Sequence, residues 1–245
     1  MNNSNRGILL FGMAFVAIAA CTTNNNTTST TAPDAHNSQN SLDWAGVYSN
    51  DNTLLRLGTD QSYSLDVKVR ADSVASHTGS FSWDEDGQNI KLSGSDEWFK
   101  VGENQVIPLD EAKAAVETEA LTKEEVVLTG GYWKLTEVNG KSAASFGSNF
   151  GRDAGLQFDG EKKMVAGNSG CNQVFGPYES SDGPGKIKIE KLRSTLMMCP
   201  SMELEQEFTE TIEKVEAYEI ANGTLLLKGS EGNVLFRFDR ALARE

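Results

Sequence analysis

Short stretches of alternating polar and apolar residues run through the first half of the chain from Leu42 onward. The clearest are residues 62–69, 80–83 and 89–92, with glycine- and aspartate-rich turns between them. Such alternation is typical of strands with one buried face. Strands this short and this evenly spaced predict an antiparallel meander that closes into a small barrel. We also expect a short helix over residues 111–121 and a last strand over residues 125–129.

The strand pattern restarts after Gly130-Gly131, which marks the best domain boundary. Further strands are expected at residues 132–138, 155–158, 163–167, 173–178, 186–189, 217–220, 224–228 and 234–239. One helix interrupts them, with Ser201 as a candidate N-cap and an apolar stripe at helical spacing formed by Leu204, Phe208, Ile212 and Val215. The sequence therefore predicts a mainly β protein with two small antiparallel barrel-like domains, residues 42–129 and 132–240. The second domain carries a single packed α-helix.

The chain begins with an apolar run at residues 8–18, which follows Arg6 and precedes small residues. This is the layout of a secretory signal peptide. An uncleaved membrane helix is disfavoured, because spanning a bilayer takes roughly 20 apolar residues. Residues 18–21, Ile-Ala-Ala-Cys, resemble a bacterial lipobox. That resemblance implies a signal over residues 1–20, cleavage before Cys21 and acylation of this cysteine.

Residues 21–41 are almost entirely Thr, Asn, Ser, Ala and Gln after the cysteine. No apolar residue recurs, so nothing offsets the entropy of ordering the backbone, and we expect a disordered tether. Thr22 follows the cysteine in place of the aspartate that commonly retains such lipoproteins in the inner membrane. By this resemblance the outer membrane is the expected location, with the folded part in the periplasm or at the cell surface.

The formal net charge of −13 limits the classes of partner. The overall charge of this chain excludes nucleic-acid binding through a general electrostatic attraction, because such binding requires positive groups that neutralise the phosphates. Anionic lipid head groups also repel such a chain, so membrane attachment would depend on the lipid on Cys21. Besides Cys21 there are two cysteines, Cys171 and Cys199, which in an exported protein suggest one disulfide. A pair of thiols that binds metal or senses redox state is the alternative.

The second domain resembles the META domain of the HslJ-like envelope proteins. The match runs in order through Trp133-Lys134-Leu135, residues 156–158, residues 167–172 with Gly170-Cys171-Asn172 at their end, residues 175–178, residues 194–199, Glu203 and Phe208, and residues 225–227 and 235–238. The resemblance implies an exported bacterial protein, sometimes linked to stress, and no settled catalytic mechanism. In the family motif the methionines of residues 197–202 fill the core and Cys199 bridges to Cys171.

The first domain resembles the N-terminal domain of the NlpE copper-resistance lipoproteins. The matching residues are Trp44 to Tyr48, residues 53–57, 63–65, 79–84, 99–102 and 106–110. That family carries a Cys-x-x-Cys loop after its first strand, whereas here the gap holds only Ser49-Asn50-Asp51-Asn52. Copper binding therefore does not carry over to this domain.

Few residues are suited to catalysis or metal binding. His36 and His77 are the only histidines, and neither lies at a metal-ligand spacing from another His or Cys. Soft thioether and thiolate ligands suit monovalent copper, so Met197, Met198, Cys199 and Met202 are the one candidate metal site. Asp84-Glu85-Asp86-Gly87 lacks the spacing of a calcium loop and predicts a hairpin turn. We expect no enzyme and no cofactor.

The expected function is a non-catalytic role of a lipid-anchored envelope protein in stress response or surface maintenance. It would act through contacts with an envelope protein partner that the sequence does not identify. A periplasmic protein that handles copper or a related metal is the alternative.

Overall fold

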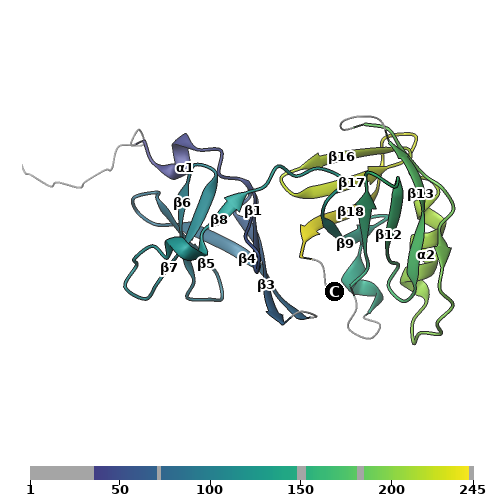
Figure 1. Cartoon of the computed structure of the whole chain (residues 1–245), viewed down its shortest axis with the longest axis horizontal. Coiled ribbons are helices and arrows are strands. Elements are labelled where there is room, and N and C mark those ends of the chain that lie inside the picture. Colours follow the sequence, from purple (N-terminus) through teal and green to yellow (C-terminus); the bar gives the residue numbers. More distant parts are fainter. Residues whose placement is uncertain (1–35, 71–72, 148–152, 181–184, 243–245) are drawn as a thin grey trace, which may run out of the picture. The chain divides into compact units, whose positions relative to one another are not determined.

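The computed structural model describes residues 36–70, 73–147, 153–180 and 185–242. The expected signal segment, Cys21 and most of the expected tether lie outside these residues. Within them the chain is mainly β, with two antiparallel sheets and two α-helices (Figure 1). The predicted fold class is confirmed.

The first sheet is a closed barrel in which eight strands follow chain order. The strands are β1 (Gly46–Ser49), β2 (Thr53–Leu57), β3 (Ser62–Arg70), β4 (Ser73–Trp83), β5 (Asn89–Leu92), β6 (Trp98–Gly102), β7 (Gln105–Leu109) and β8 (Leu121–Lys123). β8 closes the barrel because it pairs with both β7 and β1. Alternating positions face inward, and Leu55, Leu65 and Ile90 are among the side chains that form the core.

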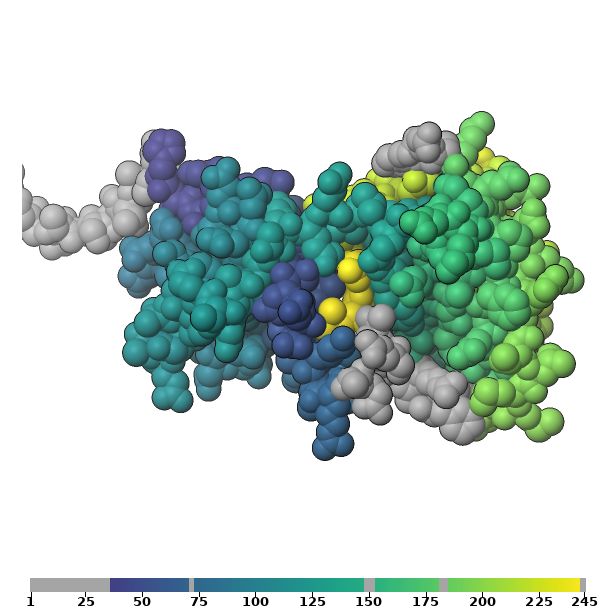
Figure 2. Space-filling view, viewed as in Figure 1, coloured from purple at the N-terminus to yellow at the C-terminus, as the bar shows by residue number. Residues whose placement is uncertain are grey.

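The β3–β4 hairpin extends well past the residues of β4 that pair with β5. β3 and β4 pair from Ser62↔Ser80 to Arg70↔Ser73, but β5 pairs only with the last three residues of β4, Phe81 to Trp83. The hairpin therefore projects beyond the other strands of the barrel, as its blue end shows in Figure 2.

Helix α1 (Ser38–Ser41) corrects the predicted tether, which was expected to extend to residue 41. Asn37 caps this helix by accepting a hydrogen bond from the Asn40 N–H at 3.0 Å. Ser38 is buried, and its hydroxyl donates to the Val101 carbonyl at 2.5 Å. The prediction was wrong here because polar side chains and main-chain groups, not apolar ones, attach this segment to the barrel.

The helix predicted over residues 111–121 is also wrong. Asp110 Oδ1 accepts from the N–H groups of Ala112 and Ala114, and Lys113 has a φ of 64°, so the chain makes a turn in place of the first helical residues. Only a 3₁₀ turn, η1 (Glu117–Glu119), follows. The last strand of the barrel was expected at residues 125–129 but lies earlier, as β8, since residues 121–123 close the barrel.

The second sheet runs in the order β14-β13-β12-β11-β9-β18-β17-β16 and is nearly closed by a bridge between Lys186 and Ala217. Its strands are β9 (Tyr132–Val138), β11 (Gly155–Asp159), β12 (Met164–Asn168), β13 (Gln173–Ser180), β14 (Ile187–Ile189), β16 (Ala217–Ala221), β17 (Thr224–Lys228) and β18 (Val234–Ala241). Two short strands, β10 (Lys141–Ser142) and β15 (Arg193–Ser194), pair with β9 and β13. A 3₁₀ turn, η2 (Ala143–Phe146), follows β10.

Helix α2 (Glu203–Ile212) packs one face against this sheet, as expected from its apolar stripe. Leu204, Phe208 and Ile212 are buried, and the ring centroids of Phe208 and Phe236 on β18 lie 5.1 Å apart. Val215 is buried too, although it follows the end of the helix. The N-cap is Met202 and makes no side-chain capping bond, so the expected cap at Ser201 is wrong: the helix begins too late for Ser201 to cap it.

Asp84 organises the acidic turn between β4 and β5. Its Oδ1 accepts from the N–H groups of Gln88 and Asn89 at 2.9 and 3.1 Å, and its Oδ2 accepts from the Asn89 side chain at 2.6 Å. Partial burial on its own would raise the pKa of Asp84, but these hydrogen bonds outweigh it and hold the pKa below the usual 3.8. The carboxylate is thus a structural part of the hairpin turn.

We predict that Asp84→Ala lowers the free energy of unfolding of the barrel by on the order of 1 kcal/mol at neutral pH. Because the folded-state pKa is depressed, the contribution of Asp84 is fully present above its unfolded pKa and is lost as pH falls through the lower, folded value. The difference between parent and variant should therefore shrink below about pH 4. Denaturant unfolding of the full chain, followed by tryptophan fluorescence across this pH range, measures it.

Asp86→Ala is the matched control, since Asp86 is an exposed acid of the same turn. It should leave the stability at neutral pH almost unchanged. A difference for Asp84→Ala that is constant down to pH 2 would contradict the prediction.

Candidate functional site

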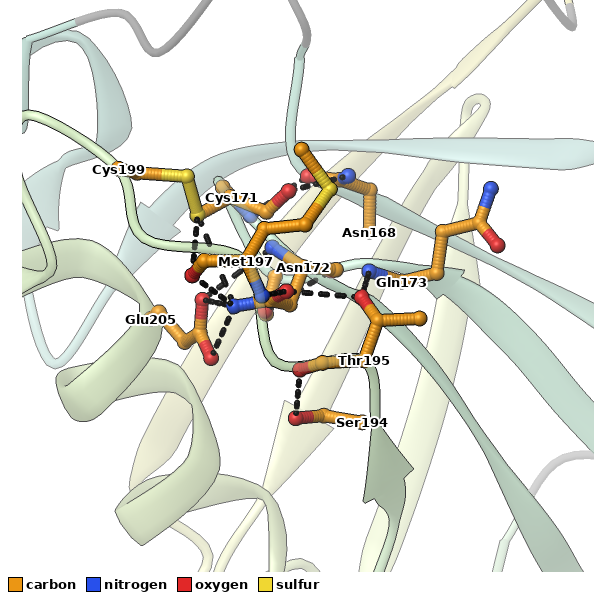
Figure 3. The surroundings of a disulfide bond; sticks show 11 residues. Asn168, Cys171, Asn172, Gln173, Ser194, Thr195, Met197, Cys199 and Glu205 are labelled. Atoms are coloured by element: carbon orange, nitrogen blue, oxygen red, sulfur yellow. Dashed lines mark hydrogen bonds between the residues drawn. A yellow bond between two sulfur atoms is a disulfide. The ribbon is translucent and has the colours of Figure 1, made fainter.

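The segment between β15 and α2, residues 195–202, is attached to the second domain through its backbone (Figure 3). We call it the Met loop. The Met197 N–H donates to Asn172 Oδ1 at 2.7 Å, and the Met197 carbonyl accepts from Asn172 Nδ2 at 3.2 Å. The Thr195 hydroxyl donates to the same Oδ1 at 2.8 Å. One side-chain amide therefore fixes the first half of the loop.

Asn172 also joins the loop to helix α2. Its Nδ2 lies 3.0 and 2.8 Å from the two carboxylate oxygens of Glu205, and its main-chain N–H donates to Glu205 Oε2 at 3.2 Å. The Asn172 side chain is 1% exposed, so these bonds form in a medium that excludes most water. Buried hydrogen bonds of this kind are costly to leave unmade, which makes the arrangement specific.

The disulfide between Cys171 and Cys199 fixes the second half of the loop. The two Cα atoms lie 6.1 Å apart, and both residues are buried. Cys171 directly precedes Asn172, so covalent and hydrogen-bonded anchors of the loop lie next to each other. The sulfur of Cys199 is bonded to Cys171 and does not provide a thiolate ligand in this structure.

The large apolar side chains of the Met loop are exposed to solvent. The exposed fractions are 97% for Leu196, 95% for Met198, 45% for Met197 and 40% for Met202. The expectation that these methionines fill the core is therefore wrong. The loop turns its main-chain groups inward toward Asn172, and this leaves the apolar side chains outside.

Acidic residues of helix α2 flank the loop. Glu203 and Glu205 lie in the first helical turn, where the helix dipole favours negative charge. Glu207 follows, and a hydrogen bond from Asn139 and contact with Lys141 hold its pKa below the usual value. Of these carboxylates, that of Glu205 lies next to the loop, because it accepts from Asn172, which binds Met197 and Thr195.

The other candidate residues lie far from a shared site. His77 pairs with Leu65 across the β3–β4 hairpin, and His36 lies 3.5 Å from the Ser41 hydroxyl beside α1. Across the described ranges, no group of three or more His, Cys, Asp or Glu is placed to hold a metal ion. Cys21 lies outside the described residues.

Among the residues that the structure describes, no helix has both the length and the apolar character needed to cross a membrane.

The fold is that of a two-domain β protein: a closed barrel is followed by a nearly closed sheet that carries one helix and the Met loop. Comparison with known families gives each domain a class: residues 126–241 match the META domain, and residues 50–119 match the NlpE N-terminal domain. The chain thus combines an NlpE-like domain with a META domain, as the sequence motifs indicated. The two matches together support a lipoprotein-type envelope protein.

Solved structures that are similar to parts of this chain include the following three. A candidate lipoprotein from Shewanella oneidensis is 32% identical, with 37% of this chain and 98% of that one covered at a TM-score of 0.32. A Burkholderia xenovorans protein is 22% identical over 47% of this chain and 85% of its own, with a TM-score of 0.36. A DUF4847 family protein from Bacteroides vulgatus is 14% identical over 49% and 96%, with a TM-score of 0.32. A search of curated proteins gives no match.

Sequence reasoning missed the roles of Asn172, Glu205 and Leu196. Asn172 belongs to the Gly170-Cys171-Asn172 segment of the family match, but the sequence does not show that its amide binds the loop. Glu205 lies in the first turn of the predicted helix, where an acid is expected for its charge alone, and the sequence does not show that it binds Asn172. Leu196 is almost fully exposed beside Met197, and no pattern along the chain indicates that a Leu-Met-Met segment lies outside the core.

We predict that Asn172→Ala destabilises the META domain by roughly 2 to 4 kcal/mol, because main-chain groups of the loop and Glu205 lose a buried partner. Asn172→Asp should cost more at neutral pH, since it places a second carboxylate against Glu205. Two adjacent carboxylates take up one proton more readily than an isolated carboxylate does. The destabilisation by Asn172→Asp should therefore decrease as pH falls toward 4. Hydrogen exchange of residues 132–241 in the full chain measures both effects.

Gln173→Ala is the matched control, because Gln173 is the exposed neighbour of Asn172. It should leave exchange protection unchanged. Equal effects of Gln173→Ala and Asn172→Ala would show that the amide does not organise the loop.

Proposed function

We propose that this protein is a lipid-anchored envelope protein with a non-catalytic role in envelope stress response or surface maintenance. It acts through contacts with another envelope protein. The observation that carries the proposal is the Met loop, which presents Leu196 and Met198 to solvent at 97% and 95% exposure. The Cys171–Cys199 disulfide anchors this loop to the domain. No reacting group is needed for such a role.

An exposed apolar loop has the energetics of a binding surface. Burial of one leucine or methionine side chain stabilises a complex by about 1.5 to 3 kcal/mol, so covering Leu196 and Met198 would favour binding of a partner. Flexible loops lose part of this gain to ordering on binding. The disulfide and the Asn172 bonds fix the backbone beforehand, and methionine side chains adapt to irregular surfaces.

The dependence on the disulfide gives the proposed role a sensing element. Without the Cys171–Cys199 bond, the second half of the loop loses its covalent anchor and the apolar side chains lose their fixed presentation. Failed disulfide formation, or failed lipidation at Cys21, then leaves the protein in the wrong state or place, and the partner detects it. The NlpE-like domain match supports this mode by analogy.

We place the protein on the outer membrane through acyl chains on Cys21, with the folded domains in the periplasm or at the cell surface. Acyl chains contribute about 0.8 kcal/mol per buried methylene, which holds a chain at a membrane without a spanning helix. The lipobox resemblance and the NlpE-like match support this location.

A photoreactive amino acid at position 198 of the full chain tests the contact. We predict that irradiation of cells links the chain to one main envelope protein, because position 198 lies at the centre of the exposed loop. The same residue at position 127 is the control: Val127 is 50% exposed but lies outside the loop. Adducts are identified by mass spectrometry.

Two further variants separate location from recognition. Leu196→Glu should remove the adduct without moving the protein from the membrane fraction. Cys21→Ala should release the protein from the outer membrane and lose the adduct with it. Equal adducts from positions 127 and 198 would contradict the docking role, and a Cys21→Ala variant that stays with the outer membrane would contradict the anchor.

Copper handling is the second candidate, and the exposed thioethers of Met197, Met198 and Met202 are the observation that favours it. Thioethers suit monovalent copper, but Cys199 is withdrawn from the ligand set by its disulfide. If this function holds, titration with Cu(I) against a competing chelator gives stoichiometric binding that the triple substitution of these methionines by leucine abolishes. Met164→Leu is the control. Absence of binding by the parent chain rejects the candidate.

A further inference from the structure

The outer edge of strand β4 has no partner strand along most of its length. β4 pairs with β3 from Ser73 to Ser80, and on its other side β5 covers only residues 81–83. Within the described residues no strand pairs with the stretch from Ser73 to Ser80 on that side. We call this stretch the β4 edge.

The hydrogen bonds of Ser80 and Phe81 show which residues of the β4 edge turn their main-chain groups to the open side. The Phe81 N–H points toward β3, where it donates to the Gln61 carbonyl, and Ser80 points the other way, where its carbonyl accepts from Ser93 N–H at 2.8 Å. Directions alternate along a strand. Val74, Ser76 and Thr78 therefore turn their N–H and carbonyl groups to the open side.

The usual protections of an open edge are missing here. Sheet edges in soluble proteins commonly carry charged residues, proline or a bulge that prevent pairing with another chain. The sequence from 73 to 80, Ser-Val-Ala-Ser-His-Thr-Gly-Ser, has no proline and no Asp, Glu, Lys or Arg. Its pairing with β3 is regular, and the one irregularity lies between Lys68 and Arg70. Residues 76–80 are exposed.

An open depression lies where β5 ends and the β4 edge begins. It has a volume of about 500 Å³, and its lining includes Ser80, Ser93, Ser95 and Asp96. Asp96 is fully exposed, apart from an ion contact of 3.7 Å with Lys91. A strand added to the β4 edge would run in line with β5 and end at this depression.

We propose that the β4 edge pairs with the β4 edge of a second copy of this chain, antiparallel about a two-fold axis at Ser76. In this register Ser76 faces Ser76 of the other copy and Val74 faces Thr78. All three residues then bond through the main-chain groups that each copy leaves open. The result is a continuous sheet in the order β3-β4-β4-β3.

Charge complementarity favours a second copy as the occupant. In the two-fold register, β3 of the other copy lies in line with β6, so Arg70 near its end meets the turn at Asp96 and Glu97. The symmetry makes this contact twice. The net charge of −13 does not prevent pairing, because the β4 edge itself holds no Asp, Glu, Lys or Arg. Charges elsewhere are screened over about 8 Å at physiological salt.

Cysteine cross-linking of the full chain tests the register. In a hydrogen-bonded antiparallel pair the two Cα atoms lie about 5.5 Å apart, within reach of a disulfide. Ser76→Cys should therefore form a covalent dimer on aerobic oxidation, seen as a doubled mass on a non-reducing gel. Thr78→Cys is the matched control: it lies on the same face, but its own symmetry mate would be about 14 Å away.

A mixture distinguishes pairing from random collision. Val74→Cys and Thr78→Cys should each give no covalent dimer alone, and a mixture of the two should give one. Cross-linking of Ser76→Cys at the same rate as Thr78→Cys would overturn the proposal. So would adducts of Ser76→Cys that contain only other proteins.

Charge substitutions test the same register without cysteine. Val74→Lys combined with Thr78→Lys places like charges opposite each other and should abolish dimers that chemical cross-linking detects in the parent. Val74→Lys combined with Thr78→Glu places opposite charges there and should restore them. A parent chain that is monomeric under all conditions, or a double-lysine variant that still dimerises, rejects the proposal.

Discussion

The side-chain amide of Asn172 is the interaction on which the arrangement of the META domain's exposed loop depends. It accepts from Met197 and Thr195 and donates to Glu205 and the Met197 carbonyl, at distances of 2.7 to 3.2 Å. The amide itself is buried, so without these partners its own nitrogen and oxygen would lack hydrogen bonds away from water. No apolar side chain could satisfy both a donor and an acceptor in this place.

This constraint explains why apolar residues lie outside the core. The backbone of the Met loop must face inward to meet Asn172, so Leu196 and Met198 face solvent. Exposure of large apolar side chains is unfavourable unless something covers them, and natural sequences depart from the burial rule mainly at functional sites. The disulfide supplies rigidity that the loop's own side chains do not provide.

The sequence predicts the regular parts of this fold well, because alternation along residues 62–69 and 80–83 reflects burial of one face of each strand. It fails where a polar side chain decides the backbone. Asp110 turns the chain where composition favours a helix, and Ser38 attaches a segment that has no apolar pattern. The Met loop is the same case at the candidate site: its composition indicates core, but a single distant amide decides its orientation.

The two exposed surfaces rest on different physical interactions, and this separates their behaviour. The Met loop offers side chains, and its presentation depends on a disulfide and a buried amide. The β4 edge offers main-chain groups, and its presentation depends only on pairing with β3. Reduction of the Cys171–Cys199 bond should therefore alter contacts at the loop and leave strand pairing at the edge unaffected. Under the two proposals, the redox state of the surroundings would act on the Met loop and not on strand pairing at the β4 edge.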